Sequence, residues 1–179
     1  TAAKFPVEVQ LTGEDGNAFF ILGKVISALR KAGATPEQVK EFEIQLNRAA
    51  EDASKKAAPI FLGAIRKMTI TDGLTILRGN QDEATQYLKR NTQAQLTTEF
   101  RPVVKASLEK VQITKYWKPL ITKYNKLNLG KKVNPNLDAY VTEKATDGLF
   151  KLIAQEEAKI RKDPVAQITD ILKLVFGGK

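Results

Sequence analysis

The chain has 179 residues and a formal net charge of +9, with 42% hydrophobic and 27% charged side chains. These values are ordinary for a globular protein, and this length suits one or at most two domains with a sizeable core. The absence of Cys and His excludes disulfides, thiolate catalysis, Ser-His-Asp triads and metal sites built on those side chains, so we expect no metal and no cofactor.

The first 33 residues are predicted to form an extended arm followed by a helix. Residues 7–11 alternate apolar and polar side chains, as a short strand does, and the turn residues 12–17 end it. Because one strand is not stable alone, this stretch must pair with another edge or lie as an arm. Residues 18–32 then carry apolar side chains at helical spacing, and Gly33 ends the helix.

Residues 34–179 are predicted to form one compact helical domain. The segment Thr35-Pro36-Glu37-Gln38 is a capping box with proline at the first helical position, so a helix begins there. We expect Pro59 to interrupt this helix at Ala58. Its apolar side chains fall on one stripe, which is formed by Val39, Phe42, Leu46, Ala49, Ala50 and Ala53.

Further helices follow along the rest of the chain. The longest opens at Asn134-Pro135 and keeps its apolar stripe for about six turns, until Asp163-Pro164. We expect Pro102 to kink or restart the helix that contains it. The sequence thus predicts an irregular all-α bundle of about seven or eight helices with a short extended N-terminal arm. The other predicted helices cover residues 60–68, 71–79 with Leu74 and Leu77, 80–88, 92–111 after a capping box at Thr92, 114–130 and 165–176.

Several stretches of the chain resemble one known family. These stretches are FEIQLNRAAE at 42–51, MT at 68–69, ATQY at 84–87, FRPVV at 100–104, YVTEKA at 140–145, DGLF at 147–150, and QEE, IR and P between 155 and 164. Through them the sequence from about residue 24 to 176 is similar to domain of unknown function 4197. The resemblance implies an all-α domain found in Gram-negative bacteria, often behind an export signal, with no known activity.

The first part of the chain departs from that family. Residues 5–33 instead resemble the opening of short hypothetical phage proteins, chiefly through LTGEDGNAF at 11–19. Either the chain is a fusion or the family is more varied than the resemblance suggests. The resemblance also implies a periplasmic or envelope location. No apolar run approaches the ~20 residues that a transmembrane helix needs, so no transmembrane segment is expected.

Positive charge is concentrated in the middle of the chain. Residues 101–132 hold nine basic side chains and one acidic side chain, and three aromatic residues are interleaved with them. Such a surface attracts an anionic partner: membrane lipid, polysaccharide or non-specific nucleic acid. The alternative is that the aromatic residues face the core and the lysines form a solvated face. The candidate binding residues are Arg101, Lys105, Lys115, Trp117, Lys118, Lys123 and Lys126.

A second candidate site lies on the longest predicted helix. Glu156 continues the apolar row of Leu149 and Ile153, and a carboxylate that faces a core needs a partner or a raised pKa, as general acids have. Glu157 and Arg161 form an i, i+4 pair. The cluster is either a structural clasp between two helices or a ligand pocket. Its candidate members are Asn47, Arg48 and Glu51 from the earlier helix with Lys144, Glu156, Glu157 and Arg161.

The sequence assigns no catalytic residue. It favours a non-enzymatic helical binding or scaffold protein of the bacterial cell envelope that contacts an anionic partner through the basic, aromatic-interleaved region. The alternative is a helical enzyme or small-ligand-binding protein that uses an interhelical Glu/Lys/Arg pocket. A third interpretation is that the protein oligomerises through the face formed by residues 116–127.

Overall fold

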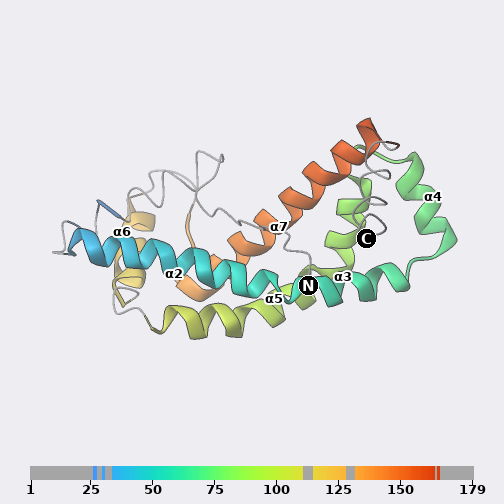
Figure 1. Ribbon diagram of the computed structural model, residues 1–179. Helices are drawn as coiled ribbons and strands as arrows, with labels where there is room; N and C mark the ends of the chain where they lie inside the picture. The colour runs from blue at the N-terminus through green and yellow to red at the C-terminus, as the bar shows by residue number, and fades with distance from the viewer. Residues whose placement is uncertain are drawn as a thin grey trace, which may run out of the picture.

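The described residues of the protein, in a computed structural model, form an all-α fold (Figure 1). The all-α prediction is therefore confirmed. The predicted count of seven or eight helices is not supported, because the described residues hold six. The structure describes residues 26–27, 30, 34–110, 115–127, 132–163 and 165. The helices are α2 (Pro36–Ser54), α3 (Ala57–Arg66), α4 (Ile70–Arg78), α5 (Glu83–Leu108), α6 (Trp117–Lys126) and α7 (Leu137–Lys162).

Both ends of the chain lie largely outside the described residues. This applies to the strand predicted over residues 7–11, and to the closing helix predicted over 165–176, of which only Val165 is described. Of the helix predicted over 18–32, three residues are described and all three are helical. The domain boundary at residue 33 stays a prediction.

The start of α2 and its buried stripe agree with the sequence. Thr35 Oγ1 accepts a hydrogen bond from Gln38 N at 3.3 Å, and Gln38 Oε1 accepts one from Thr35 N at 2.9 Å. All six residues of the predicted stripe are buried. The interruption comes earlier than predicted, because α2 ends at Ser54. Pro59 therefore lies in the first turn of α3, where no intrahelical N–H donor is needed.

The helix α5 is longer than the sequence suggested. We expected one helix to end near Leu88 and another to begin at Thr92, but Thr92 is buried within α5 and donates its hydroxyl to Leu88 O at 2.6 Å. Pro102 also lies inside α5 without ending it. Proline leaves the carbonyl four residues earlier without a helical partner, and that residue, Thr98, is exposed, so water can satisfy it.

The core lies between the three longest helices. The helices α2, α5 and α7 contact one another, while α3 and α4 contact α5. Figure 1 shows α6 at one end of the molecule and α4 at the other. Each large apolar side chain that is fully buried here contributes about 1.5–3 kcal/mol to folding. The principal core residues are Phe42 and Leu46 of α2, Leu96, Phe100 and Val104 of α5, and Val141, Ala145 and Leu149 of α7.

The short helix α4 has no buried residue. Its N-terminus is closed by a capping box, in which Thr69 Oγ1 accepts from Asp72 N at 3.1 Å and Asp72 Oδ2 accepts from Thr69 N at 2.9 Å. Leu74 and Leu77, the two leucines of this predicted helix, are exposed. They do not reach the core because α4 extends beyond the α2–α5–α7 core.

The connection from α4 to α5 depends on the small size of Gly79. A Cβ atom there would lie 2.8 Å from the carbonyl oxygen of Thr75 and 2.7 Å from Glu83 Cβ. We expect Gly79→Ala to destabilise the protein by about 1–3 kcal/mol, because the Thr75 carbonyl is backbone and cannot move without unwinding α4. Chemical denaturation followed by circular dichroism measures the change.

Gly63 provides the matched control. It lies inside α3, and apart from the surrounding helix backbone nothing lies within 4 Å of a Cβ placed there. Gly63→Ala should therefore stabilise the protein by about 0.5–1 kcal/mol through helix propensity alone. Equal effects of the two substitutions would contradict the steric explanation for Gly79.

Candidate functional site

The helix α6 is anchored to the core through one of its faces. Trp117 and Ile121 are both buried in the core. The indole Nε1 of Trp117 donates to Asn134 O at 3.2 Å, and the Trp117 ring lies 4.9 Å from the ring of Tyr140, centroid to centroid. These contacts join α6 to α7 and fix the direction in which the other face of α6 points.

A second contact ties α6 to the segment before α7. Asn125 Nδ2 donates to Val133 O at 2.7 Å, and Asn125 Oδ1 accepts from Val133 N at 2.9 Å. One amide side chain thus satisfies both backbone groups of a buried residue, as a neighbouring β-strand would. Both ends of α6 are therefore held in place.

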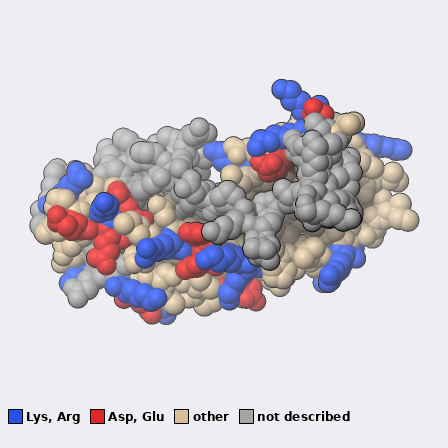
Figure 2. Space-filling view, viewed as in Figure 1, with Lys and Arg blue, Asp and Glu red and all other residues tan. Residues whose placement is uncertain are grey.

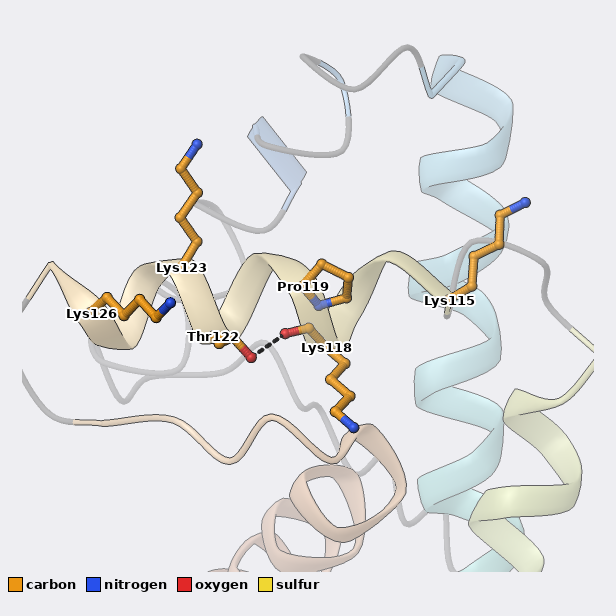
Figure 3. A pocket seen from close by; sticks show the side chains of 6 residues that line it. All are labelled: Lys115, Lys118, Pro119, Thr122, Lys123 and Lys126. Carbon is orange, nitrogen blue, oxygen red and sulfur yellow. Dashed lines mark hydrogen bonds between the residues drawn. The ribbon is translucent and has the colours of Figure 1, made fainter.

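The outward face of α6 carries exposed lysines. Figure 3 shows them around a shallow groove of about 510 Å³, with the side chains of Lys118 and Lys123 leaving the helix on opposite sides. Thr122 Oγ1 donates to Lys118 O at 2.7 Å, so its only hydroxyl proton is already used. We call this surface the α6 lysine groove; its lining residues are Lys115, Lys118, Pro119, Thr122, Lys123 and Lys126.

The charge around this groove is of one sign. The sequence has no Asp or Glu between residues 110 and 137. Among the described residues, none of the four groove lysines belongs to an ion pair. Over α2 and α5, in contrast, basic and acidic side chains are mixed on the face shown in Figure 2. The α6 lysine groove therefore presents positive charge that no neighbouring acid on α6 neutralises.

Three of the predicted basic-surface residues do not join this groove. Trp117 is only 2% exposed, so its prediction as a surface contact was wrong; the indole instead anchors α6. Arg101 Nε donates to Asp138 Oδ2 at 2.8 Å, which neutralises its charge against α7. Lys105 Nζ lies 3.8 Å from the Glu109 carboxylate within its own segment. The other four, Lys115, Lys118, Lys123 and Lys126, are brought together as predicted.

The second candidate site is built around Glu157, which is 8% exposed. Its Oε2 accepts from Thr85 N at 2.8 Å and from Thr85 Oγ1 at 2.7 Å, and its Oε1 accepts from Ala84 N at 2.9 Å. The first turn of α5 has no other side-chain cap, since Asp82 makes none. A carboxylate from α7 therefore caps the N-terminus of α5, where the helix dipole favours negative charge.

Arg161 completes this cluster one turn further along α7. Its Nε and Nη2 donate to Glu157 Oε1 at 3.0 and 2.8 Å, and Nη2 also donates to Ile76 O at 2.7 Å, near the end of α4. The pair thus links α4, α5 and α7. We call Glu157, Arg161 and Thr85 the interhelical clasp.

The hydrogen bonds of the clasp determine the ionisation of Glu157. Desolvation by burial on its own would raise the pKa of this carboxyl. The hydrogen bonds from Ala84, Thr85 and Arg161 outweigh desolvation and hold the pKa of Glu157 below its ordinary value of 4.5. A general acid needs the opposite shift, so the observed arrangement is that of a structural carboxylate.

The other predicted members of the polar cluster lie elsewhere. The prediction that Glu156 faces the core was wrong: its side chain is 62% exposed and accepts from Lys159 Nζ at 2.6 Å. Lys144 lies beside the Tyr140 ring, with Nζ 5.8 Å from its centroid. The α2 residues Asn47, Arg48 and Glu51 are exposed and take no part in the clasp.

Sequence reasoning missed Thr85 as a member of this site. A threonine in the first turn of a helix often caps its own helix, so its sequence context gave no sign of a partner 72 residues away. The one usable signal was the i, i+4 spacing of Glu157 and Arg161, which did identify two of the three side chains.

Three further features of the described ranges bear on other kinds of site. Those residues contain no cluster of three or more acidic side chains that could hold a metal ion. No helix among them has both the length and the apolar character to cross a bilayer. Every buried side-chain nitrogen or oxygen in this part of the chain has a hydrogen-bond partner.

The sequence was compared with curated proteins, with solved structures and with models of protein families. The chain finds no match among curated proteins or among solved structures. A family model described as protein of unknown function (DUF4197) matches residues 21–177. Because this match spans most of the chain, the protein belongs to the DUF4197 family.

Proposed function

We propose that this protein is a non-enzymatic helical binding domain of the bacterial cell envelope, and that the α6 lysine groove contacts an anionic partner. The observation that carries the proposal is a set of four exposed lysines, three on α6 and Lys115 just before it, with no acidic residue in the surrounding sequence. Trp117 and Asn125 fix this helix. The family resemblance to exported proteins of Gram-negative bacteria supports the location.

The chemistry of the groove favours an extended anionic surface over a small ligand. Lysine ammonium groups act as point charges and lack the planar fork with which arginine reads phosphates or bases. The groove is shallow and its side chains diverge (Figure 3), so it cannot enclose a small molecule. Binding should therefore be driven by charge, insensitive to sequence and weakened by salt.

The enzyme alternative has less support from the interhelical clasp. Both Glu157 oxygens there accept hydrogen bonds from α5 or Arg161, and Arg161 Nε and Nη2 donate to Glu157 and Ile76 O. Lys144 and Arg48, the other members of the predicted pocket, do not reach it. A site whose donors and acceptors are satisfied within the protein serves the fold.

Charge reversal on α6 tests the proposal. In the variant Lys118→Glu/Lys123→Glu, we expect affinity for anionic vesicles and for DNA at low salt to fall at least about tenfold, since each lysine near an anionic surface contributes about 1 kcal/mol. Co-sedimentation and fluorescence anisotropy over a salt series measure the loss, and the salt dependence should become shallower.

The variant Lys40→Glu/Arg48→Glu on α2 is the matched control. It changes net charge by the same amount at two exposed positions but leaves α6 intact, so it should lower affinity much less. If both variants lose affinity equally, only net charge matters; if neither does, the groove is not the contact. Either result would overturn the proposal.

A further inference from the structure

The end of the molecule opposite α6 exposes a group of large apolar side chains. On α4, Ile70 is 85% and Leu77 76% exposed, and Leu74 is exposed beside them. Residues at i, i+4 and i+7 share one face of a helix, so these three lie together. Leu62 and Ile65, on the last turns of α3, are exposed just before them in the chain. We call these five residues the α3–α4 apolar face.

The helix α4 keeps its shape without burying this face. A helix of nine residues is marginal by itself in water, and no residue of α4 is buried. It is held at both ends instead: Thr69 and Asp72 form the capping box, and Arg161 Nη2 donates to Ile76 O at 2.7 Å. The apolar face is thus preformed and points away from the core.

The rim of this face is basic. Arg66, Lys67 and Arg78 are exposed next to it, at the end of α3 and the end of α4. Asp72, the acidic residue within α4, is engaged with Thr69 as a cap. Figure 2 shows a largely uncharged surface at this end of the molecule, with basic side chains at its margin.

An apolar face with a cationic rim matches the interface of an anionic lipid bilayer. Leucine and isoleucine side chains enter the boundary between headgroups and acyl chains, while lysine and arginine bind the anionic headgroups. A nucleic acid or a polysaccharide would satisfy the cations but leave the apolar side chains in water. We propose that the α3–α4 apolar face inserts into the surface of an anionic membrane. This inference goes beyond the α6 lysine groove, because a different surface carries it.

A single fluorescent label tests insertion directly. The chain has no cysteine, so Leu77→Cys provides one site for an environment-sensitive dye such as NBD. With vesicles that contain phosphatidylglycerol we expect the emission to shift to the blue and brominated lipids to quench it. Glu51→Cys, on the exposed side of α2, is the control label and should show neither change.

Removing the apolar side chains tests whether they contribute to binding. Because Ile70 and Leu77 are so exposed, Ile70→Gln/Leu77→Gln should fold normally, which circular dichroism and denaturation can establish. We expect vesicle affinity to fall at least about tenfold, since each buried aliphatic side chain contributes more than a fivefold factor. DNA affinity should not change. Arg78→Gln should instead lower the affinity for anionic vesicles about fivefold and leave the affinity for uncharged vesicles unchanged.

Three results would overturn this inference. A blue-shifted label at Leu77 in the protein alone, at monomeric concentration, would mean that the chain itself covers the face. A dimer in light scattering that Ile70→Gln/Leu77→Gln dissociates would mean that a second copy covers it. Vesicle binding with an unshifted label, abolished by Lys118→Glu/Lys123→Glu, would assign membrane contact to the α6 lysine groove alone.

Discussion

The variant Glu157→Gln is expected to unfold with a free energy about 3 kcal/mol lower than that of the unsubstituted protein, within the range for removing one partner of a buried charge pair. Glutamine has nearly the same shape, but its amide nitrogen cannot accept a hydrogen bond. The amide nitrogen must therefore face either Ala84 N and Arg161 or Thr85 N without bonding, and Arg161 loses its counter-charge.

The size of this effect follows from how many elements meet at one carboxylate. Glu157 supplies the cap that α5 lacks, and through Arg161 it also holds α4. Its removal thus leaves backbone N–H groups of α5 unsatisfied near the core. Urea denaturation followed by circular dichroism measures the change.

The adjacent residue serves as control. Glu156→Gln removes the same charge one position away, but Glu156 is exposed and pairs with the equally exposed Lys159. Exposed pairs of this kind contribute little, so stability should change by no more than about 0.5 kcal/mol. If the two variants were equally stable, the clasp would not be the structural element described above.

The same carboxylate should make stability dependent on acid pH. A group whose folded pKa is lowered stabilises the fold above its unfolded pKa, and that contribution disappears as the pH falls through the folded pKa. For Glu157 the loss should therefore begin below its ordinary value of about 4.5. Glu157→Gln should flatten the acid limb of the stability profile. The flattening should be partial, because the Thr69 hydrogen bonds also lower the pKa of Asp72.

The sequence predicted best those elements whose signals are local. The capping box at Thr35 and Gln38 lies within four residues, and the buried stripe of α2 follows from helical spacing alone. Prolines were harder to interpret, because their effect depends on where they fall in a helix. Pro59 is tolerated in a first turn and Pro102 on an exposed face, and neither placement is determined by the proline itself.

Functional positions were predicted less well where tertiary contacts determine them. Glu156 and Glu157 are neighbours in the sequence. Glu157 is the one that is buried and hydrogen-bonded because α5 packs against the end of α7 on its side. Leu74 and Leu77 have the spacing of core residues, yet periodicity cannot distinguish a face that packs inward from one that faces outward. The sequence was equally ambiguous for Trp117, which lies among lysines and could have faced solvent or the core. The structure shows that it faces the core.

The substitution Trp117→Ala should affect stability and binding together. We expect a loss of about 3–5 kcal/mol in the free energy of unfolding, as for other large buried aromatic residues. The indole fills the core under α6, stacks against Tyr140 and donates to Asn134 O. Without it, α6 loses its largest buried side chain, and the lysines lose their fixed orientation. Circular dichroism during denaturation measures the first effect, and vesicle and DNA affinity at low salt the second.

Trp117→Phe separates the anchoring role from the hydrogen bond. Phenylalanine keeps a ring against Tyr140 and loses the bond to Asn134 O, so stability should fall by only about 1 kcal/mol beyond the change in packing. Its affinity for anionic vesicles should remain close to that of the unsubstituted protein, whereas that of Trp117→Ala should fall. A folded Trp117→Ala protein with unchanged affinity would show that the lysines bind without a rigid α6. The buried tryptophan would then serve stability only, and the positive charge of this segment would act independently of the geometry in which the fold presents it.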